Sequence, residues 1–168
     1  MDILTPKGQQ TLRDELVAAE IFQLATGCLY VTTPKDMPAK VDAVIIGQAG
    51  QLVAVVETKC RYGVTRQQLR DGWGDEWLVT MEKLDEGRQA ARLLGVPLFG
   101  FLFLVEEALL LTKVIASPAG QYCCRLRVDQ TETQATVNGG KATRANAFVD
   151  MSDAREWSLT KETDNGVG

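Results

Sequence analysis

Residues Lys40 to Arg61 read KVDAVIIGQAGQLVAVVETKCR, and the expected architecture of the chain follows from them. Two apolar, β-branched runs, Val41–Ile46 and Leu52–Val56, flank the short polar segment Gly47–Gln51. Such runs on either side of a glycine-containing segment predict a β-hairpin. Both runs are apolar on both faces, which is typical of central strands covered on each side.

This hairpin is expected to bring two acids and an amine together. Asp42 and Glu57 are equidistant from the centre of the predicted turn, so they would face each other in a symmetric hairpin. Side chains alternate along a strand, so Lys59 projects to the same face as Glu57, and Asp42 shares that face.

Two carboxylates at the rim of a buried sheet need a partner, because burying a bare charge is costly. A hard divalent cation suits them, since Mg²⁺ prefers oxygen ligands and usually takes only one or two from protein. The pattern therefore predicts a metal-dependent hydrolytic site. The alternative is an ordinary hairpin with a surface Glu–Lys pair.

The same residues carry a family resemblance. The pattern resembles the motif of the PD-(D/E)XK, restriction-endonuclease-like nuclease superfamily: an acid, Asp42, is followed after the length of a hairpin by Glu57-Thr58-Lys59. The resemblance covers about Thr11 to Ile115, and Val41 stands where the motif's name has proline. It implies an α/β fold with the core order α-β-β-β-α-β, in which helices flank a mixed central sheet. Extra strands are expected after this core.

The resemblance also implies roles for the motif residues. Asp42 and Glu57 would bind Mg²⁺ or Mn²⁺, with the backbone carbonyl of Thr58 as a third ligand. Lys59 would orient the attacking water and offset the negative charge that develops on the phosphate.

Members of this family often carry a further acid on the first helix. Thr5-Pro6-Lys7 predicts the start of that helix and Gly27 its end. Glu20 matches the family position, and because it falls four residues after Leu16 we expect it on the buried side. Glu15 is the alternative candidate, and a solvated glutamate at position 20 is the other interpretation.

A basic stretch follows the motif. The run from Cys60 to Arg70 contains no acid, and its candidate nucleic-acid-binding residues are Arg61, Arg66, Gln67, Gln68 and Arg70. Arginine binds phosphate in a bidentate manner, so the run could hold a nucleic-acid backbone. Gln68, or Gln67, resembles a glutamine of exonuclease-like members, but their companion tyrosine is not at the usual spacing. A solvated helical face is the alternative.

The remaining apolar patterns predict the rest of the fold. A short strand is expected over Cys28–Thr33, a long helix over Asp75–Leu94 and a buried strand over Leu98–Val105. A helical crossover makes this buried strand parallel to the Glu57 strand, and Ala108–Ala116 then returns antiparallel.

The C-terminal third predicts smaller elements. We expect a strand over Gln121–Val128, a loop or irregular hairpin over Asp129–Thr143, and an edge strand over Asn146–Asp150. A short helix capped by Ser152-Asp153 would run to Trp157, and Thr160–Gly168 would be disordered. Residues 1–160 are therefore expected to form one nuclease-like domain, with 161–168 as a tail.

Composition narrows the chemistry. The chain has 168 residues, a net charge of −4 and no histidine. The lack of histidine excludes Ser-His and Cys-His catalysis and His-ligated zinc or iron. There is no P-loop or Rossmann fingerprint, so no organic cofactor is expected, and no apolar stretch reaches transmembrane length. Four cysteines without a secretory signal predict reduced thiols in the cytoplasm.

Together these patterns favour a Mg²⁺-dependent deoxyribonuclease, of an exonuclease-, resolvase- or restriction-like kind. DNA is preferred to RNA because most of the resembled superfamily acts on DNA. One alternative keeps the fold in a catalytically inactive binding or assembly protein, which the acidic charge favours. Another is a small-molecule phosphatase. Since the net charge of the chain is negative, a homo-oligomer or a partner protein could complete the DNA-binding surface.

Overall fold

The computed structural model describes residues 5–34, 39–134 and 141–159, so the predicted disorder of Thr160–Gly168 lies outside the described part. The chain is an α/β protein with a mixed six-stranded sheet, in the order β1-β2-β3-β5-β6-β9, and a three-stranded sheet, in the order β4-β8-β7. The helices are α1 (Pro6–Thr26), α2 (Arg66–Trp73), α3 (Met81–Leu94) and the 3₁₀ turn η1 (Val105–Glu107). The strands are β1 (Leu29–Thr32), β2 (Ala43–Ile46), β3 (Leu52–Arg61), β4 (Glu76–Thr80), β5 (Leu98–Leu104), β6 (Leu109–Ala116), β7 (Leu126–Gln134), β8 (Lys141–Asp150) and β9 (Arg155–Ser158).

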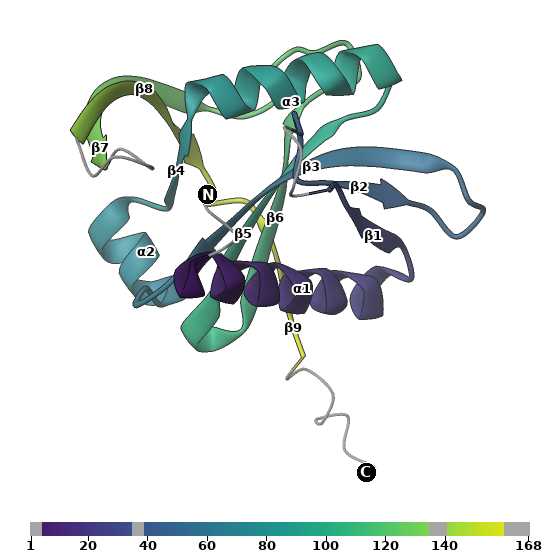
Figure 1. Cartoon of the computed structure of the whole chain (residues 1–168), viewed down its shortest axis with the longest axis horizontal. Helices are drawn as coiled ribbons and strands as arrows, with labels where there is room; N and C mark the ends of the chain where they lie inside the picture. Colours follow the sequence, from purple (N-terminus) through teal and green to yellow (C-terminus); the bar gives the residue numbers. More distant parts are fainter. Residues whose placement is uncertain (1–4, 35–38, 135–140, 160–168) are drawn as a thin grey trace.

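Helices α1 and α3 cover opposite faces of the larger sheet (Figure 1). On the α1 face, Ala18, Ile21 and Phe22 pack in one apolar cluster with residues of β2, β3 and β5. On the α3 face, Leu84 and Ala91 belong to a second cluster, which extends into the smaller sheet. The six-stranded sheet thus separates two cores, each with its own helix. None of the described helices is both long enough and apolar enough to span a membrane.

The first helix begins and ends where the sequence predicts. The Thr5 side chain accepts a hydrogen bond from the Gly8 N–H at 3.1 Å, and Pro6 occupies the first turn. Gly27 closes the helix with φ of 70°, a left-handed conformation that glycine adopts at little cost.

The predicted hairpin is confirmed. Strands β2 and β3 are antiparallel, with Ala43 opposite Val56 and a register shift near the turn between Ile45 and Ile46. The predicted parallel pairing of β3 with β5, and the antiparallel return of β6, are confirmed as well. These pairings put the Glu57 strand in the middle of the sheet.

The predicted helix over Asp75–Leu94 is wrong in its first third. Residues Glu76–Thr80 form strand β4, which pairs with β8, and α3 begins only at Met81. Trp77 and Val79 are buried on alternate positions, as a strand requires. Trp77 and Met81 also fit a helical spacing, so periodicity over so short a run could not separate the two states.

The C-terminal predictions also need correction. Strand β8 lies between β4 and β7, so it is a central strand and not an edge strand. Of the loop or irregular hairpin predicted over Asp129–Thr143, the hairpin alternative is borne out, since β7 extends to Gln134 and pairs antiparallel with β8. Where a short helix was predicted, Arg155–Ser158 forms β9, which covers the free edge of β6. The Trp157 indole donates to Thr112 Oγ1 at 2.8 Å and fixes that pairing.

Candidate functional site

Asp42 lies at the point where β2 begins and binds the neighbouring strand through both its backbone and its side chain. Its N–H donates to the Val56 carbonyl at 2.9 Å, and its Oδ2 accepts from the Thr58 N–H at 2.9 Å. Backbone N–H groups of a strand point within the plane of the sheet. The Asp42 carboxylate therefore occupies the in-plane position where β2 would otherwise continue.

This geometry corrects one detail of the prediction. Residues two apart in a regular strand share a face, yet Val41 packs in the cluster on the α3 side and Ala43 in the cluster on the α1 side. The chain bends at Asp42, which accordingly does not project from a regular strand to the face of Glu57. Because the Asp42 carboxylate lies in the plane of the sheet, its negative charge acts to raise the pKa of side chains on both faces of the sheet.

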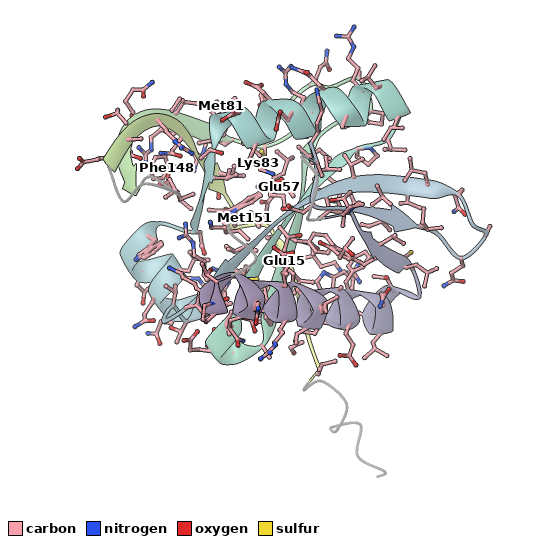
Figure 2. All side chains as sticks on the ribbon, in the orientation of Figure 1. Glu15, Glu57, Met81, Lys83, Phe148 and Met151 are labelled. Atoms are coloured by element: carbon pink, nitrogen blue, oxygen red, sulfur yellow. The ribbon has the colours of Figure 1, made fainter. Side chains whose placement is uncertain are left out.

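Glu57 and Lys59 project to the α3 face. Glu57 is only 6% exposed, and its Oε2 lies 3.9 Å from Nζ of Lys83, which comes from the first turn of α3 (Figure 2). Lys59 is exposed. Desolvation and the charge of Arg61 lower the pKa of Lys59, while the charges of Glu57 and Asp42 act in the opposite direction.

Thr58 and Cys60 project to the α1 face. The Thr58 and Tyr30 hydroxyls lie 2.7 Å apart in a buried hydrogen bond. Burial is the main reason that the pKa of Tyr30 is raised, the hydrogen bond opposes the rise, and the charges of Asp42 and Glu15 add to it. Tyr30 thus lies within electrostatic reach of both acids.

The prediction that Glu20 lies on the buried side is wrong, because Glu20 is exposed. The buried face of α1 includes Glu15, Ala18, Ala19 and Phe22, which follow the helical spacing i, i+3, i+4 and i+7. Leu16, which defined the predicted stripe, is 58% exposed. Glu15, the alternative candidate, is 6% exposed and is one of two buried acids of α1, the other being Asp14.

Two of the predicted phosphate-binding arginines are engaged within the protein. The Arg61 guanidinium donates to the Leu78 carbonyl at 3.3 Å and stacks over the Trp73 ring. Arg66 forms ion pairs with Asp75 and Glu156. Arg61 thereby links β3 to β4, and Arg66 links α2 to Asp75 and to β9, so these contacts give both side chains a structural role.

The other three residues of that prediction lie on the outer surface of α2. Gln68 closes a capping box with Thr65 at the start of the helix. Gln67 and Arg70 are exposed, and Arg70 Nε lies 3.9 Å from Asp75 Oδ2. A shallow depression lined by Gln67, Gln68 and Trp73 is found here, so this part of the predicted surface is accessible.

Whether these residues suit a metal ion depends on the donor set. No group of three or more His, Cys, Asp or Glu side chains placed to hold a metal occurs in the described ranges. Asp42 and Glu57 provide two hard carboxylates from adjacent strands, and Mg²⁺ usually takes only one or two from protein. Two carboxylates thus match the number of protein ligands that a magnesium ion usually takes while it keeps several waters.

Sequence reasoning missed Lys83, Tyr30 and Asp14. Lys83 is 24 residues beyond Lys59 in the sequence, and only the packing of the start of α3 against β3 brings it to Glu57. Asp14 is buried on α1 and accepts a hydrogen bond from the Tyr62 hydroxyl at 2.7 Å. The sequence of α1 did contain a sign that Glu15 is buried, because the small residues of the helix lie on the same face as Glu15.

Stability is expected to fall at alkaline pH. Burial raises the pKa of Cys60 from 9.0 to about 12 and raises that of Tyr30 as well. A raised pKa in the folded state contributes stability that is complete below the unfolded-state value and is lost as pH rises through the folded-state value. The loss should therefore occur between about pH 9 and 12, at no more than about 1.4 kcal/mol per pH unit and group.

Urea denaturation of wild type and Cys60→Ala between pH 8 and 11 measures this effect. The wild-type curve should fall more steeply than the Cys60→Ala curve, because only the wild type buries this neutral thiol. Parallel curves for the two proteins would show that the Cys60 thiol ionises as easily in the folded chain as in the unfolded one.

Comparisons with known proteins identify no relative, so the proposed function is argued from this geometry. No family model, no curated protein and no solved structure matches the chain.

Proposed function

We propose that this chain is a metal-dependent nuclease of the PD-(D/E)XK type that hydrolyses phosphodiester bonds in DNA. One observation carries the proposal: Asp42 Oδ2 lies 2.9 Å from the N–H of Thr58, the middle residue of Glu57-Thr58-Lys59. The first acid of the motif thereby lies directly beside the other motif residues, on the adjacent strand.

The order of elements supports the same assignment. Helix α1 is followed by β1, β2 and β3, and the chain then crosses through α3 to β5, which is parallel to β3. With α2 and β4 set aside, this order corresponds to the α-β-β-β-α-β core that the resemblance implies. Strand β4 and helix α2 would then be insertions into the crossover, and β6, β7, β8 and β9 would be the extra strands after the core.

In this proposal Asp42 and Glu57 hold Mg²⁺ or Mn²⁺, with the Thr58 carbonyl as a further oxygen donor. The bound ion would lower the pKa of a water and offset charge on the phosphate oxygens. Lys59, exposed on the face of Glu57, would direct its ammonium to the phosphate. Glu15 replaces Glu20 as the acid on the first helix. Glu15 is buried, and its charge acts on Tyr30, as the charge of Asp42 does.

Cleavage assays with Lys59→Ala test the proposal. Wild type should cut at least one of linear, nicked, branched and single-stranded DNA in Mg²⁺ or Mn²⁺, and EDTA should stop the reaction. Lys59→Ala should lower the rate by about 10²-fold or more, the cost of losing a charge aimed at the reacting group. Arg155→Ala, which removes a positive charge from β9 at the far edge of the sheet, should leave the rate nearly unchanged.

A second candidate function is a catalytically inactive binding or assembly protein of the same fold. The observation that favours it is the Lys83 ammonium, which already gives Glu57 a positive partner. The net charge of −4 also suits a protein that binds another protein rather than DNA alone. If wild type cuts none of the four DNA forms in either metal, this function replaces the nuclease.

A further inference from the structure

Lys83 is the cation beside the buried carboxylate of the candidate site. Its Nζ lies 3.9 Å from Glu57 Oε2, and the exposed fractions of the two side chains are 39% and 8%. Lys83 therefore reaches from solvent to a carboxylate that solvent hardly touches. Lys59 projects to the same face of β3, so two ammonium groups flank Glu57.

The place of Lys83 in its helix is unfavourable for a lysine. It is the third residue of α3, in the first turn, where the helix dipole is positive and destabilises a cation. The Thr80 side chain accepts no hydrogen bond from this turn, so it does not reduce the positive character of the first N–H groups. The helix dipole disfavours a cation at this position, and Glu57 supplies an opposite charge 3.9 Å away.

A divalent ion at Glu57 changes the surroundings of this ammonium. The ion and Lys83 carry charges of the same sign and would both lie within a few ångströms of one carboxylate, so they compete for it. Once the ion neutralises Glu57, an anion on the solvent side becomes the better partner for Lys83. In a nuclease that anion is a phosphate of the substrate.

We propose that Lys83 is a substrate-positioning residue that exchanges partners, pairing with Glu57 in the metal-free protein and with a substrate phosphate once the metal is bound. This inference rests on the proposed nuclease function. The exchange makes metal binding and DNA binding interdependent. A DNA phosphate pairs with the Lys83 ammonium, which otherwise competes with the metal ion for Glu57.

Direct metal binding, measured by titration calorimetry with Mn²⁺ in the absence of DNA, tests the first half of the exchange. Lys83→Gln should bind Mn²⁺ about tenfold more tightly than wild type, the size expected for one partly exposed charge near the ion. Lys83→Arg keeps the charge and should resemble wild type. Arg92→Gln is the matched control, because it removes a charge from the last turn of the same helix.

DNA binding with Ca²⁺ in place of Mg²⁺ tests the second half. Lys83→Gln should bind DNA several-fold more weakly than wild type, and its salt dependence should decrease by about one phosphate contact. Lys83→Arg should keep the wild-type DNA affinity and the wild-type salt dependence. A merely structural role at the start of α3 would not explain a salt dependence that follows the charge of this side chain.

The outcomes separate this inference from the function on which it rests. If wild type binds Mn²⁺ and Asp42→Asn does not, but Lys83→Gln binds Mn²⁺ like wild type, the exchange is refuted and the nuclease proposal stands. If wild type itself binds no Mn²⁺, both fall together. Tighter Mn²⁺ binding with unchanged DNA binding would also overturn the exchange, because the ammonium would then have no phosphate partner.

Discussion

Asp42→Ala is expected to lower Mg²⁺-dependent DNA cleavage by at least about 10³-fold, which corresponds to about 4 kcal/mol of transition-state stabilisation. The substitution removes one of the two carboxylates assigned to the ion. It also removes the acceptor of the Thr58 N–H, and loss of that hydrogen bond should destabilise the fold by about 1–2 kcal/mol. Single-turnover cleavage rates and urea denaturation measure the two effects on the same preparation.

Asp42→Asn separates the two contributions. The amide oxygen of asparagine can still accept from the Thr58 N–H, but it carries no negative charge for a metal. This variant should therefore keep most of the stability and lose cleavage almost as completely as Asp42→Ala. Asp71→Asn, a change at an exposed acid of α2, is the control. Near wild-type cleavage by Asp42→Asn would mean that Asp42 is a structural acceptor and nothing more.

Trp77→Ala is expected to have the largest effect on stability, about 3–5 kcal/mol, the range for large aromatic side chains in a core. Trp77 is fully buried between the two sheets, and its ring lies directly on Gly100 of β5. A Cβ at Gly100 would lie 2.4 Å from the ring, so the position beneath the indole has no side chain of its own to fill the space that the indole leaves. Chemical denaturation should show the loss as a lower midpoint with a similar slope.

Trp73→Ala is the matched control for this change. Trp73 is four residues earlier and 44% exposed, and it contacts the Arg61 guanidinium. Its replacement should cost about 0.5–1 kcal/mol, the value of an exposed cation–π contact. A Trp77→Ala cost as small as that of Trp73→Ala would contradict the packing of β4 against the larger sheet.

The sequence was sufficient for the centre of the fold because its signals there are local. The β2–β3 hairpin shows as two apolar runs around a short turn, and α1 carries a capping threonine, a proline and a terminal glycine. The parallel neighbour of β3 follows from a crossover too long for a hairpin. These features fixed which strand carries Glu57 and which precedes it.

Other features depend on contacts that no local pattern records. Strand β9 exists because β6 offers a free edge, and the short run around Trp157 could equally have formed a helix. Strand β4 is a strand because β8 pairs with it. In both cases tertiary pairing overrides a weak local preference.

The sequence predicted only part of the candidate site, because the rest of the site also depends on tertiary contacts. The proximity of Asp42 and Glu57 follows from hairpin symmetry, but the bend that puts the Asp42 carboxylate in the sheet plane does not. On α1, exposed leucines suggested the wrong face, whereas small residues next to Glu15 form the buried one. Lys83 reaches Glu57 only through the start of α3, which the sequence placed inside a longer helix.

A crystal structure of the wild-type protein grown with Mn²⁺ tests the central claim most directly, because anomalous scattering locates the ion without reference to activity. The account predicts one strong peak bonded to carboxylate oxygens of both Asp42 and Glu57, and no peak at this position in crystals of Asp42→Asn. A wild-type site without Mn²⁺, or an ion bound away from these two acids, would contradict it.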